Sequence, residues 1–409
     1  MRVLLVSLYW PPAGGPGVQR PLKLAGHLAE LGVEVHVLAP DDPKWLHRDE
    51  SLTEPDGITV HRARNLGPRS RRPGEELHGL RGLARGRAHA SLAFRRVLVP
   101  DAAVLWNTTA IPKARRIARE HGIDVVLTTS PPGSVHFVGA ALGRRDGPAW
   151  VADLRDSIAR HSQRRRDVRG EGRLAATVAK RAHAVICASE VIAEEMRVAG
   201  AGKRVHVVGN GADFEEFDGL EYVPSAQFRI THTGSFFGAR DPRPFLEALA
   251  RVEGDIVARF VGDFRGRDRE HAERLELGRR LELVSYLPRH EALSLQRNSE
   301  ALLLLIPHAG GRGRGVLSGK VFEYLAAERP ILALVPPAGE AARLIETSGA
   351  GEVVDPEDIP GTVSALQRLI DRHGRDGSIP AALPTELRDR LARRSRAAEF
   401  LEIFEDVAR

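Results

Sequence analysis

The sequence predicts an α/β protein made of two Rossmann-like halves, each containing a parallel β-sheet. Short apolar runs alternate with amphipathic segments, a pattern typical of βα units. The alternation fades near residue 213 and starts again at residue 228. A chain of 409 residues is long enough for two or three domains, each with its own core.

The first half contains seven apolar runs that we expect to form buried parallel strands. They cover residues 3–8, 33–39, 58–63, 125–130, 149–154, 184–189 and 205–210. Helical patterns lie between many of them, for example at 21–32, 110–122 and 191–200. Within 21–32, the side chains of Leu24, Leu28 and Leu31 share one face, and Gly32 occupies a typical helix C-cap position.

The second half repeats the pattern and sets the expected domain limits. Its apolar runs cover residues 228–234, 255–263, 281–288, 301–307, 331–336 and 351–356. We therefore expect a first domain over 1–212, a linker over 213–227 and a second domain over 228–385. Residues 386–409 are expected to form a terminal helix, which commonly crosses back to the first domain in this fold class.

Composition limits the classes of function. A net charge of +6 and a pI near 9.8 permit a polyanionic partner, but 54 of the 60 basic residues are arginines, a bias typical of GC-rich genomes. The segment from Arg62 to Arg96 holds ten arginines and two acids. It is interpreted as a solvated region, with an anionic lipid or a phosphate-bearing acceptor as the alternative. Nucleic acid is disfavoured because few aromatic residues are available for base stacking.

The sequence also predicts location and redox state. The longest apolar runs fall far short of the roughly 20 residues of a membrane span, and the N-terminal run is too short for a signal peptide. We expect a cytoplasmic protein, with peripheral binding to the inner membrane face as a further option. The single cysteine, Cys187, excludes an internal disulfide and is expected to be a buried apolar residue.

A glycine-rich loop lies between the first strand and the first helix. Gly15 and Gly17 allow the backbone to approach a ligand, and the following helix N-terminus favours negative charge. A purely structural turn is the alternative. Arg20 stands where a dinucleotide fingerprint needs its third glycine, although Asp41 after the second strand keeps a nicotinamide cofactor open.

Polar residues follow the fourth and fifth expected strands. His136 comes after Pro131-Pro132 and is interpreted either as a ligand-contacting group or as an ordinary half-buried histidine. Asp153 and Asp156 are candidates to position an acceptor hydroxyl or to act as its base. A structural ion pair between Asp153 and Arg155 is the alternative.

The second half contains a matching set of residues. Gly234 follows a strand, and Arg240 or Arg243 lies near the next helix. In the segment 318–358, Lys320 and Glu323 begin an apolar helix that precedes the strand 331–335. An exposed helical ion pair is the alternative interpretation of Lys320 and Glu323.

The order of these motifs resembles a known family. Lys-x-x-Glu-Tyr-Leu-Ala-Ala at 320–327 and Arg-Pro-Ile-Leu-Ala at 329–333 resemble the donor-binding segment of retaining glycosyltransferases of the family 4-like group, within the glycogen synthase/mannosyltransferase-like superfamily. The glycine loop, the Pro-Pro segment, Asp-x-Arg-Asp at 153–156 and Asn-Gly-Ala-Asp at 210–213 occur in the same order as in that family. The resemblance implies a GT-B fold, in which two Rossmann-like domains face each other across a cleft.

The resemblance also implies roles for the first domain, which would bind the acceptor. Gly15 and Gly17 would meet the donor diphosphate, and His136 would reach the donor sugar. Asp153 and Asp156 would act on the acceptor.

For the second domain, the resemblance implies that Lys320 with Arg240 or Arg243 binds the diphosphate. Glu323 would bind the ribose, and Tyr286 would flank the base. The family has another glutamate eight positions before the ribose-binding one, and here that position is Gly315. A donor loop of Gly315, Val316, Leu317 and Ser318 would present backbone amides instead.

The expected activity is that of a hexosyltransferase-type glycosyltransferase acting with retention. The donor would be a UDP-, GDP- or dTDP-sugar, and the acceptor a saccharide, a lipid-linked saccharide or a natural-product aglycone. No cofactor is expected, and no metal, because the sequence shows no Asp-x-Asp at the relevant place and no clustered histidine ligands. A nucleotide-sugar 2-epimerase of the same fold and a non-catalytic nucleotide-binding protein are the alternatives.

Overall fold

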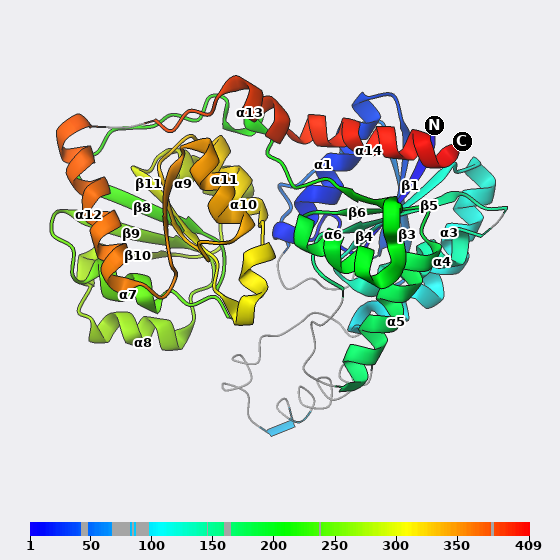
Figure 1. The fold of residues 1–409 in the computed structure, drawn as a ribbon, viewed down its shortest axis with the longest axis horizontal. Helices are drawn as coiled ribbons and strands as arrows, with labels where there is room; N and C mark the ends of the chain where they lie inside the picture. Colours follow the sequence, from blue (N-terminus) through cyan, green and yellow to red (C-terminus); the bar gives the residue numbers. More distant parts are fainter. Residues whose placement is uncertain are drawn as a thin grey trace. The chain divides into compact units, whose positions relative to one another are not determined.

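A computed structural model describes residues 1–41, 48–67, 82–83, 86, 98–144, 146–158, 165–236, 239–377 and 380–409. The chain divides into two compact units (Figure 1). Unit 1 comprises Met1–Gly209 and Arg396–Arg409, and unit 2 comprises Asn210–Ser395.

Unit 1 is built on a seven-stranded sheet in which every pair of neighbours is parallel, in the order β3-β2-β1-β4-β5-β6-β7. The strands are β1 (Arg2–Ser7), β2 (Glu34–Pro40), β3 (Ile58–Ala63), β4 (Val125–Ser130), β5 (Ala149–Leu154), β6 (Ala184–Cys187) and β7 (Val205–Val207). The α-helices are α1 (Pro16–Glu30), α3 (Asn107–His121), α4 (His136–Leu142), α5 (Arg165–Arg181) and α6 (Glu190–Met196). Short 3-10 and π turns connect them.

Helices cover both faces of this sheet because its central strands are apolar on both sides. Every residue of β4 and β5 is buried, as parallel strands require when helices pack on each face. One face contacts α1 and the end of the chain, and the other contacts α3 and α4. The carboxyl ends of the strands therefore form one edge of the sheet, onto which the following loops open.

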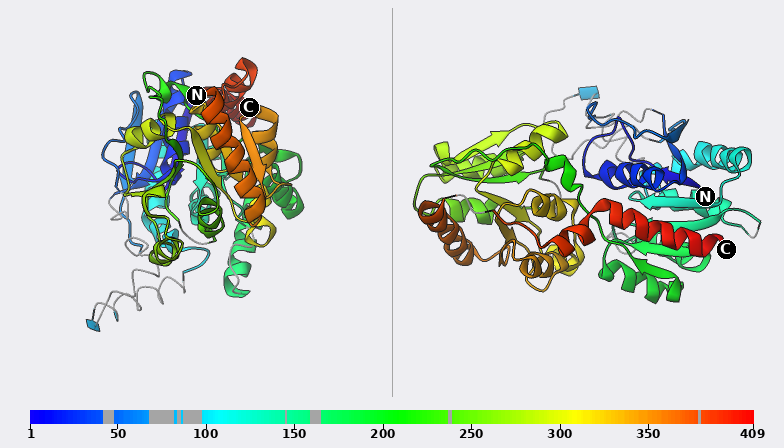
Figure 2. Two further views of the ribbon diagram at one scale, coloured as in Figure 1. Left: turned by 90° about the vertical axis from the view of Figure 1, so that its left-hand side faces the viewer. Right: turned by 90° about the horizontal axis from the view of Figure 1, so that it is seen from above.

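Unit 2 contains a six-stranded parallel sheet in the order β10-β9-β8-β11-β12-β13. The strands are β8 (Phe228–Thr233), β9 (Ile256–Val261), β10 (Leu281–Val284), β11 (Ala301–Leu305), β12 (Ile331–Leu334) and β13 (Gly351–Val354). The α-helices are α7 (Arg243–Leu249), α8 (Gly266–Arg274), α9 (Arg289–Arg297), α10 (Gly319–Ala326), α11 (Glu340–Ser348), α12 (Ile359–Asp376) and α13 (Thr385–Leu391). Figure 2 gives two further views of these layers.

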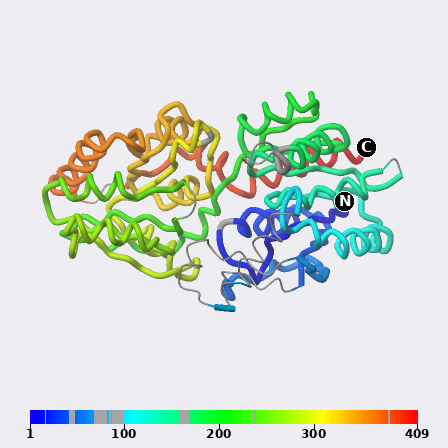
Figure 3. The backbone as a smooth tube through the Cα atoms, turned by 90° about the horizontal axis from the view of Figure 1, so that it is seen from below, coloured from blue at the N-terminus to red at the C-terminus, as the bar shows by residue number. Residues whose placement is uncertain are grey.

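The final helix, α14 (Arg393–Ala408), starts in unit 2 and runs into unit 1, as the red end of the tube in Figure 3 shows. Its buried Phe400 and Phe404 belong to the same apolar cluster as Leu24 and Leu28 of α1. An apolar stripe near the C-terminus therefore completes a core that begins with the first strand.

All thirteen expected strands are present, and the prediction of two parallel sheets is confirmed. Some helix limits differ from the expected ones. The segment 191–200 is helical only to Met196 and then forms a π turn around Gly200, whose φ is +102°. The expected terminal helix is interrupted at Ala392, whose extended backbone separates α13 from α14.

Residues 213–227, expected to be a linker, belong to unit 2. Phe214 and Phe217 of this segment are buried in the core of unit 2, so the segment packs against that unit. Most of the arginine-rich segment 62–96 lies outside the described residues. Across the described parts of the chain, no helix is both long and apolar enough to cross a lipid bilayer.

Candidate functional site

In unit 2, a lysine amine lies directly over the glycine that follows β8. Gly234 has φ +126°, and a Cβ placed on it would lie 2.3 Å from Nζ of Lys320. The positive φ favours glycine here, and any side chain would have to displace the lysine amine. Tyr324 of the same helix as Lys320 fixes the end of β8, because its hydroxyl accepts a hydrogen bond from the backbone N–H of Thr233 at 2.9 Å.

The helix α10 places two functional side chains on its one polar face. Val321, Phe322, Tyr324 and Leu325 are buried in the core, whereas Lys320 and Glu323 are only partly buried. These two residues are three apart and therefore neighbours on a helix. The exposed ion pair that was the alternative interpretation of these two residues does not form, because Glu323 pairs with Arg289 instead.

The electrostatics around Lys320 suit a bound anion. Burial lowers the pKa of the Lys320 amine to about 7, and the nearby Arg240 guanidinium contributes to the shift, while Glu323 opposes it. Within the described residues, no hydrogen bond or ion pair engages the Nζ atom of Lys320. Two neighbouring cations would both be stabilised by an anion placed between them.

The structure separates the two arginines that the sequence left equivalent. Arg240 is close enough to Lys320 to influence its pKa. Arg243 instead pairs with Asp241, with 2.8 Å between Nε and Oδ1, and its side chain is 43% exposed. Arg240 is therefore the arginine that shares a site with Lys320.

Glu323 is held in place by an ion-pair network that sequence reasoning missed. Arg289, at the start of α9, donates from Nη1 to Glu323 at 2.9 Å and from Nε to Glu216 at 3.1 Å. Burial works against the charged carboxylate, yet Arg289 holds the pKa of Glu323 below its ordinary value. The carboxylate is thus charged and held in one orientation. The sequence did not indicate this role of Arg289, because the chain contains many arginines and no motif distinguishes this one.

The remaining expected donor residues lie in loops of unit 2. Tyr286 is 38% exposed and follows β10 by two residues. Gly315 ends a 3-10 turn, Val316 is exposed, and the carbonyl of Leu317 accepts from Asn210 at 3.4 Å. Ser318 precedes α10 without a capping side-chain hydrogen bond. The assignment of these residues to base and donor binding stays a prediction.

In unit 1, Asp153 at the end of β5 forms a buried ion pair with Arg20 of α1. The Arg20 Nη2 donates to Asp153 Oδ1 at 2.7 Å, and Thr129 donates to Oδ2 at 2.6 Å. Asp153 is fully buried. Asp153 is therefore in a structural ion pair, as the alternative interpretation had it, but its partner is Arg20 and not Arg155.

Arg155 has a different function, which the sequence did not suggest. Its guanidinium donates to the carbonyls of Ser130 at 2.8 Å, Gly17 at 2.6 Å and Pro131 at 3.1 Å. It therefore joins the loop after β1 to the loop after β4. Asp156, next in the chain, is exposed at this edge of the sheet.

The glycines of the first loop serve two different purposes. Gly15 caps α1 with φ +89° and has open space around its Cα. Gly17 packs against Tyr9, whose ring would lie 3.1 Å from an added Cβ. The chain therefore passes tightly over Tyr9 before α1 begins, with the helix N-terminus directed at this edge of the sheet.

His136 begins α4 and is fully buried rather than half-buried. Its Nδ1 lies 2.8 Å from the Thr128 hydroxyl, which also accepts a hydrogen bond from the Trp150 indole at 2.8 Å. Its Nε2 is buried without a hydrogen-bond partner among the described residues. Burial lowers the pKa of His136 to about 3, so its ring is neutral at physiological pH. Its role towards a donor sugar stays a prediction.

Unit 1 also contains a buried cysteine and a group of three histidines. Cys187 is buried and unpaired, as predicted, and burial raises the pKa of its thiol to about 12. Among the described residues, three histidines, His36, His61 and His121, are close enough to share a metal ion. Their separation along the sequence hid this group from motif analysis.

Comparison with known proteins agrees with this arrangement. Residues 14–211 match the family model described as a glycosyl transferase 4-like domain. No curated protein matches the sequence significantly.

Similar solved structures extend over both units. Anabaena HepE, solved in complex with UDP and glucose, has 16% sequence identity and a TM-score of 0.66, covering 99% of this chain and all of the other. A glycosyltransferase from Rickettsia africae has 13% identity and a TM-score of 0.68, covering 99% and 98% of the two chains. The lipopolysaccharide outer core galactosyltransferase WaaB has 13% identity and a TM-score of 0.61, covering 99% of each chain.

These likenesses establish the architecture of the whole chain. The fold with two parallel sheets is shared with these structures over 99% of this chain. The chain therefore has the predicted GT-B fold, and its residues 14–211 resemble a glycosyl transferase 4-like domain.

Proposed function

We propose that this protein is a glycosyltransferase that moves a sugar from a nucleoside-diphosphate sugar to an acceptor hydroxyl. The observation that carries the proposal is the partly buried Lys320 amine over Gly234, beside Arg240 and next to an oriented Glu323 carboxylate. The match to a glycosyl transferase 4-like domain and the fold shared with UDP-sugar complexes support it.

The chemistry of sugar transfer explains why these charges are needed. The bond between the anomeric carbon and the diphosphate oxygen breaks, a bond from that carbon to the acceptor oxygen forms, and the hydroxyl proton must leave. Negative charge grows on the departing diphosphate, and the cations Lys320 and Arg240 stabilise it. Since they supply this positive charge, we propose that the reaction needs no metal.

Glu323 gives the donor site its preference for a nucleoside. A charged carboxylate can accept hydrogen bonds from both ribose hydroxyls, and Arg289 prevents it from turning away. The solved complexes of the similar Anabaena protein contain UDP and UDP-glucose. We therefore propose UDP-hexose as the first donor to test, with GDP- and dTDP-sugars as the alternatives.

The acceptor side is assigned to unit 1. We propose that Asp156, which is exposed after β5, accepts the proton of the acceptor hydroxyl. The fully buried Asp153 and the Arg155 that joins two loops hold this edge of the sheet in shape. The family resemblance further supports retention of the anomeric configuration.

The first test is the thermal stability of the purified protein with UDP, GDP, dTDP or NADH. A ligand at about 100 times its dissociation constant adds about 2.7 kcal/mol, which a melting curve resolves. We expect one nucleoside diphosphate to stabilise the wild type, and Lys320→Ala and Glu323→Ala to lose the effect. Stabilisation by NADH alone, or by none of these compounds, would contradict the proposal.

Two exposed residues provide matched controls. Lys203→Ala and Glu346→Ala remove the same side-chain types from exposed positions and should keep the full shift. Once the base is known, the corresponding UDP-, GDP- or dTDP-hexose should release the nucleotide faster when an acceptor saccharide is added. The anomeric proton coupling of the product, measured by NMR, then decides between retention and inversion.

A further inference from the structure

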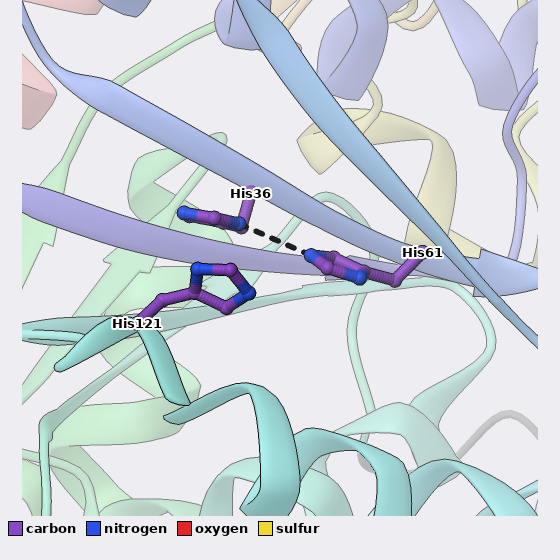
Figure 4. A group of neighbouring side chains, drawn as sticks. All are labelled: His36, His61 and His121. Carbon is purple, nitrogen blue, oxygen red and sulfur yellow. Dashed lines mark hydrogen bonds between the residues drawn. The ribbon is translucent and has the colours of Figure 1, made fainter. Parts of the chain in front are cut away.

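Three histidine side chains from three elements of unit 1 converge on one point, as Figure 4 shows. His36 lies on β2, His61 on β3 and His121 at the end of α3. Residue 61 pairs with residue 38, two positions after His36, so the first two side chains project from the same face of the sheet. The helix α3 brings the third ring onto that face.

The spacing of the rings suits coordination of a single ion. His36 Nδ1 and His61 Nε2 are 3.1 Å apart, and one ligand nitrogen from each ring lies within 4.8 Å of the others. Zinc–nitrogen bonds of about 2.0–2.1 Å place tetrahedral ligands roughly 3.3 Å apart. The first pair already has this separation, and a contraction of about 1.5 Å at most brings in the remaining nitrogen.

An acidic side chain prepares His36 as a ligand. The Oε1 atom of Glu34 lies 3.0 Å from Nε2 of His36. When Nε2 carries the proton and donates it to this carboxylate, Nδ1 carries no proton and has a lone pair for a ligand. Metal-binding histidines commonly donate their second nitrogen to a carboxylate in this way, which fixes the tautomer and the ring orientation. Without a metal, this lone pair accepts a hydrogen bond from Nε2 of His61 (Figure 4), and a bound ion would replace that proton while His61 carries its own proton on Nδ1.

A metal ion needs neutral imidazole rings and a route to the three histidines. His36 is buried, whereas His61 and His121 are partly exposed, so an ion can enter from the solvent side.

We propose that His36, His61 and His121 bind one transition-metal cation of the zinc class, with Glu34 as an outer carboxylate and water in the fourth position. His36 lies near the start of β2, away from the carboxyl-terminal edge of the sheet that carries Asp156. Since the ion would join β2, β3 and the end of α3, its role is structural. The proposal does not depend on the proposed transferase activity.

The test is metal binding by the full-length, tag-free protein. After treatment with a chelator, we expect the wild type to bind one Zn²⁺ per chain, measured by competition with a chromogenic chelator. Cobalt(II) should give the visible absorption bands of a tetrahedral site. Saturation with Zn²⁺ at about 100 times the dissociation constant should raise Tm by roughly 5–10 °C, and EDTA should reverse this.

Variants assign the binding to these residues. Loss of an outer partner typically lowers metal affinity by roughly 10–100-fold, and we expect Glu34→Gln to lower Zn²⁺ affinity within that range. His61→Ala and His121→Ala remove direct ligands and should lower Zn²⁺ affinity by more. His290→Ala, which removes an exposed histidine of unit 2, should bind like the wild type. Substoichiometric binding by the wild type, or equal loss in His290→Ala, would overturn the proposal. Circular dichroism shows whether each variant is folded, and His61→Gln replaces any variant that is not.

Discussion

Lys320 illustrates how a residue obtains its chemistry from its surroundings. An ordinary lysine has a pKa of 10.5, and burial together with Arg240 lowers that of Lys320 to about 7. In the ligand-free protein, this amine is therefore only partly protonated at physiological pH. A bound diphosphate would favour the protonated, charged form. This coupling gives the donor site a distinctive pH dependence.

We expect the affinity for the nucleoside diphosphate to fall as the pH rises above about 7. Binding must then add a proton to Lys320, and uptake of one proton lowers the association constant by up to about tenfold per pH unit. Isothermal titration calorimetry between pH 6 and pH 9 measures this slope. Lys320→Arg should retain binding with a flat profile, because arginine stays charged throughout. A slope of equal size in that variant would exclude Lys320 as its origin.

The same shift affects the stability of the ligand-free protein. The unfolded lysine binds its proton more tightly than the folded one, so unfolding takes up a proton between about pH 7 and pH 10.5. The contribution of Lys320 to the free energy of unfolding therefore increases as the pH rises through this window.

The buried pair of Asp153 and Arg20 predicts a large loss of stability on removal of one partner. Asp153→Asn should lower the free energy of unfolding by about 3–5 kcal/mol, because it removes the buried carboxylate that accepts hydrogen bonds from Arg20 and Thr129. All four tryptophans, at positions 10, 45, 106 and 150, belong to the sequence of unit 1, so tryptophan fluorescence during urea unfolding reports on this unit.

An exposed ion pair is the appropriate control. Glu190 pairs with Arg197 on the surface of unit 1, and Glu190→Gln should leave the urea midpoint nearly unchanged. Equal urea midpoints for Asp153→Asn and Glu190→Gln would show that the buried pair stabilises unit 1 no more than the exposed pair does.

At the scale of elements, the site of unit 2 depends on contact between a loop and a helix. Gly234→Ala should weaken nucleotide binding by about 10–100-fold, because the new methyl group displaces the Lys320 amine and a charge-assisted contact is lost. Calorimetric titration at pH 6.5, where the lysine is charged, measures the loss.

Gly219→Ala is the control that distinguishes displacement of the Lys320 amine from backbone strain. Gly219 also has a positive φ, of +76°, but a Cβ there has open space around it. Both variants should lose some stability, since alanine disfavours this backbone region, but only Gly234→Ala should lose affinity. If both bind like the wild type, the lysine does not contact the ligand from this position.

The break between the last two helices is determined by contacts with a distant segment. The separation of α13 from α14 occurs at Ala392, in a segment whose helical pattern continues without a visible stop signal in the sequence. Arg393 at this point forms an ion pair with Asp213 at 2.7 Å, and its backbone N–H donates to the carbonyl of Ala212. These contacts to a distant segment of unit 2 override the local preference for helix.

At the scale of the whole molecule, the end of the chain contributes to the stability of unit 1. Phe400 is buried there among the residues of α1, and the guanidinium of Arg20 lies 5.2 Å from the centre of its ring. Phe400→Ala should reduce the free energy of unfolding by about 3–5 kcal/mol, seen by tryptophan fluorescence although no tryptophan lies near it in sequence.

Phe245→Ala removes an equally buried ring from unit 2 and serves as the control. Because unit 2 has no tryptophan, the fluorescence transition should shift less with Phe245→Ala than with Phe400→Ala. The reverse order would mean that α14 is not part of the core of unit 1.

Most of the fold could be predicted from the sequence because its strands are buried on both faces. Such strands are continuous apolar runs, and each of the thirteen runs became a strand. Helix ends were less well predicted, since a π turn after Met196 and the break at Ala392 depend on contacts with other segments. The composition likewise predicted the buried, unpaired state of Cys187.

The sequence by itself determined the two parallel sheets, the strands that form them and the short list of polar residues that follow their ends. Those properties depend on local apolar periodicity and on glycine placement. Only the tertiary structure decided which charges meet: Asp153 with Arg20 instead of Arg155, Glu323 with Arg289 instead of Lys320, and Arg240 instead of Arg243 beside the lysine. It also brought together three histidines that are far apart in sequence. The physical reason is that charge pairing depends on distance in space, and with 54 arginines in the chain the sequence offers many partners for each acid.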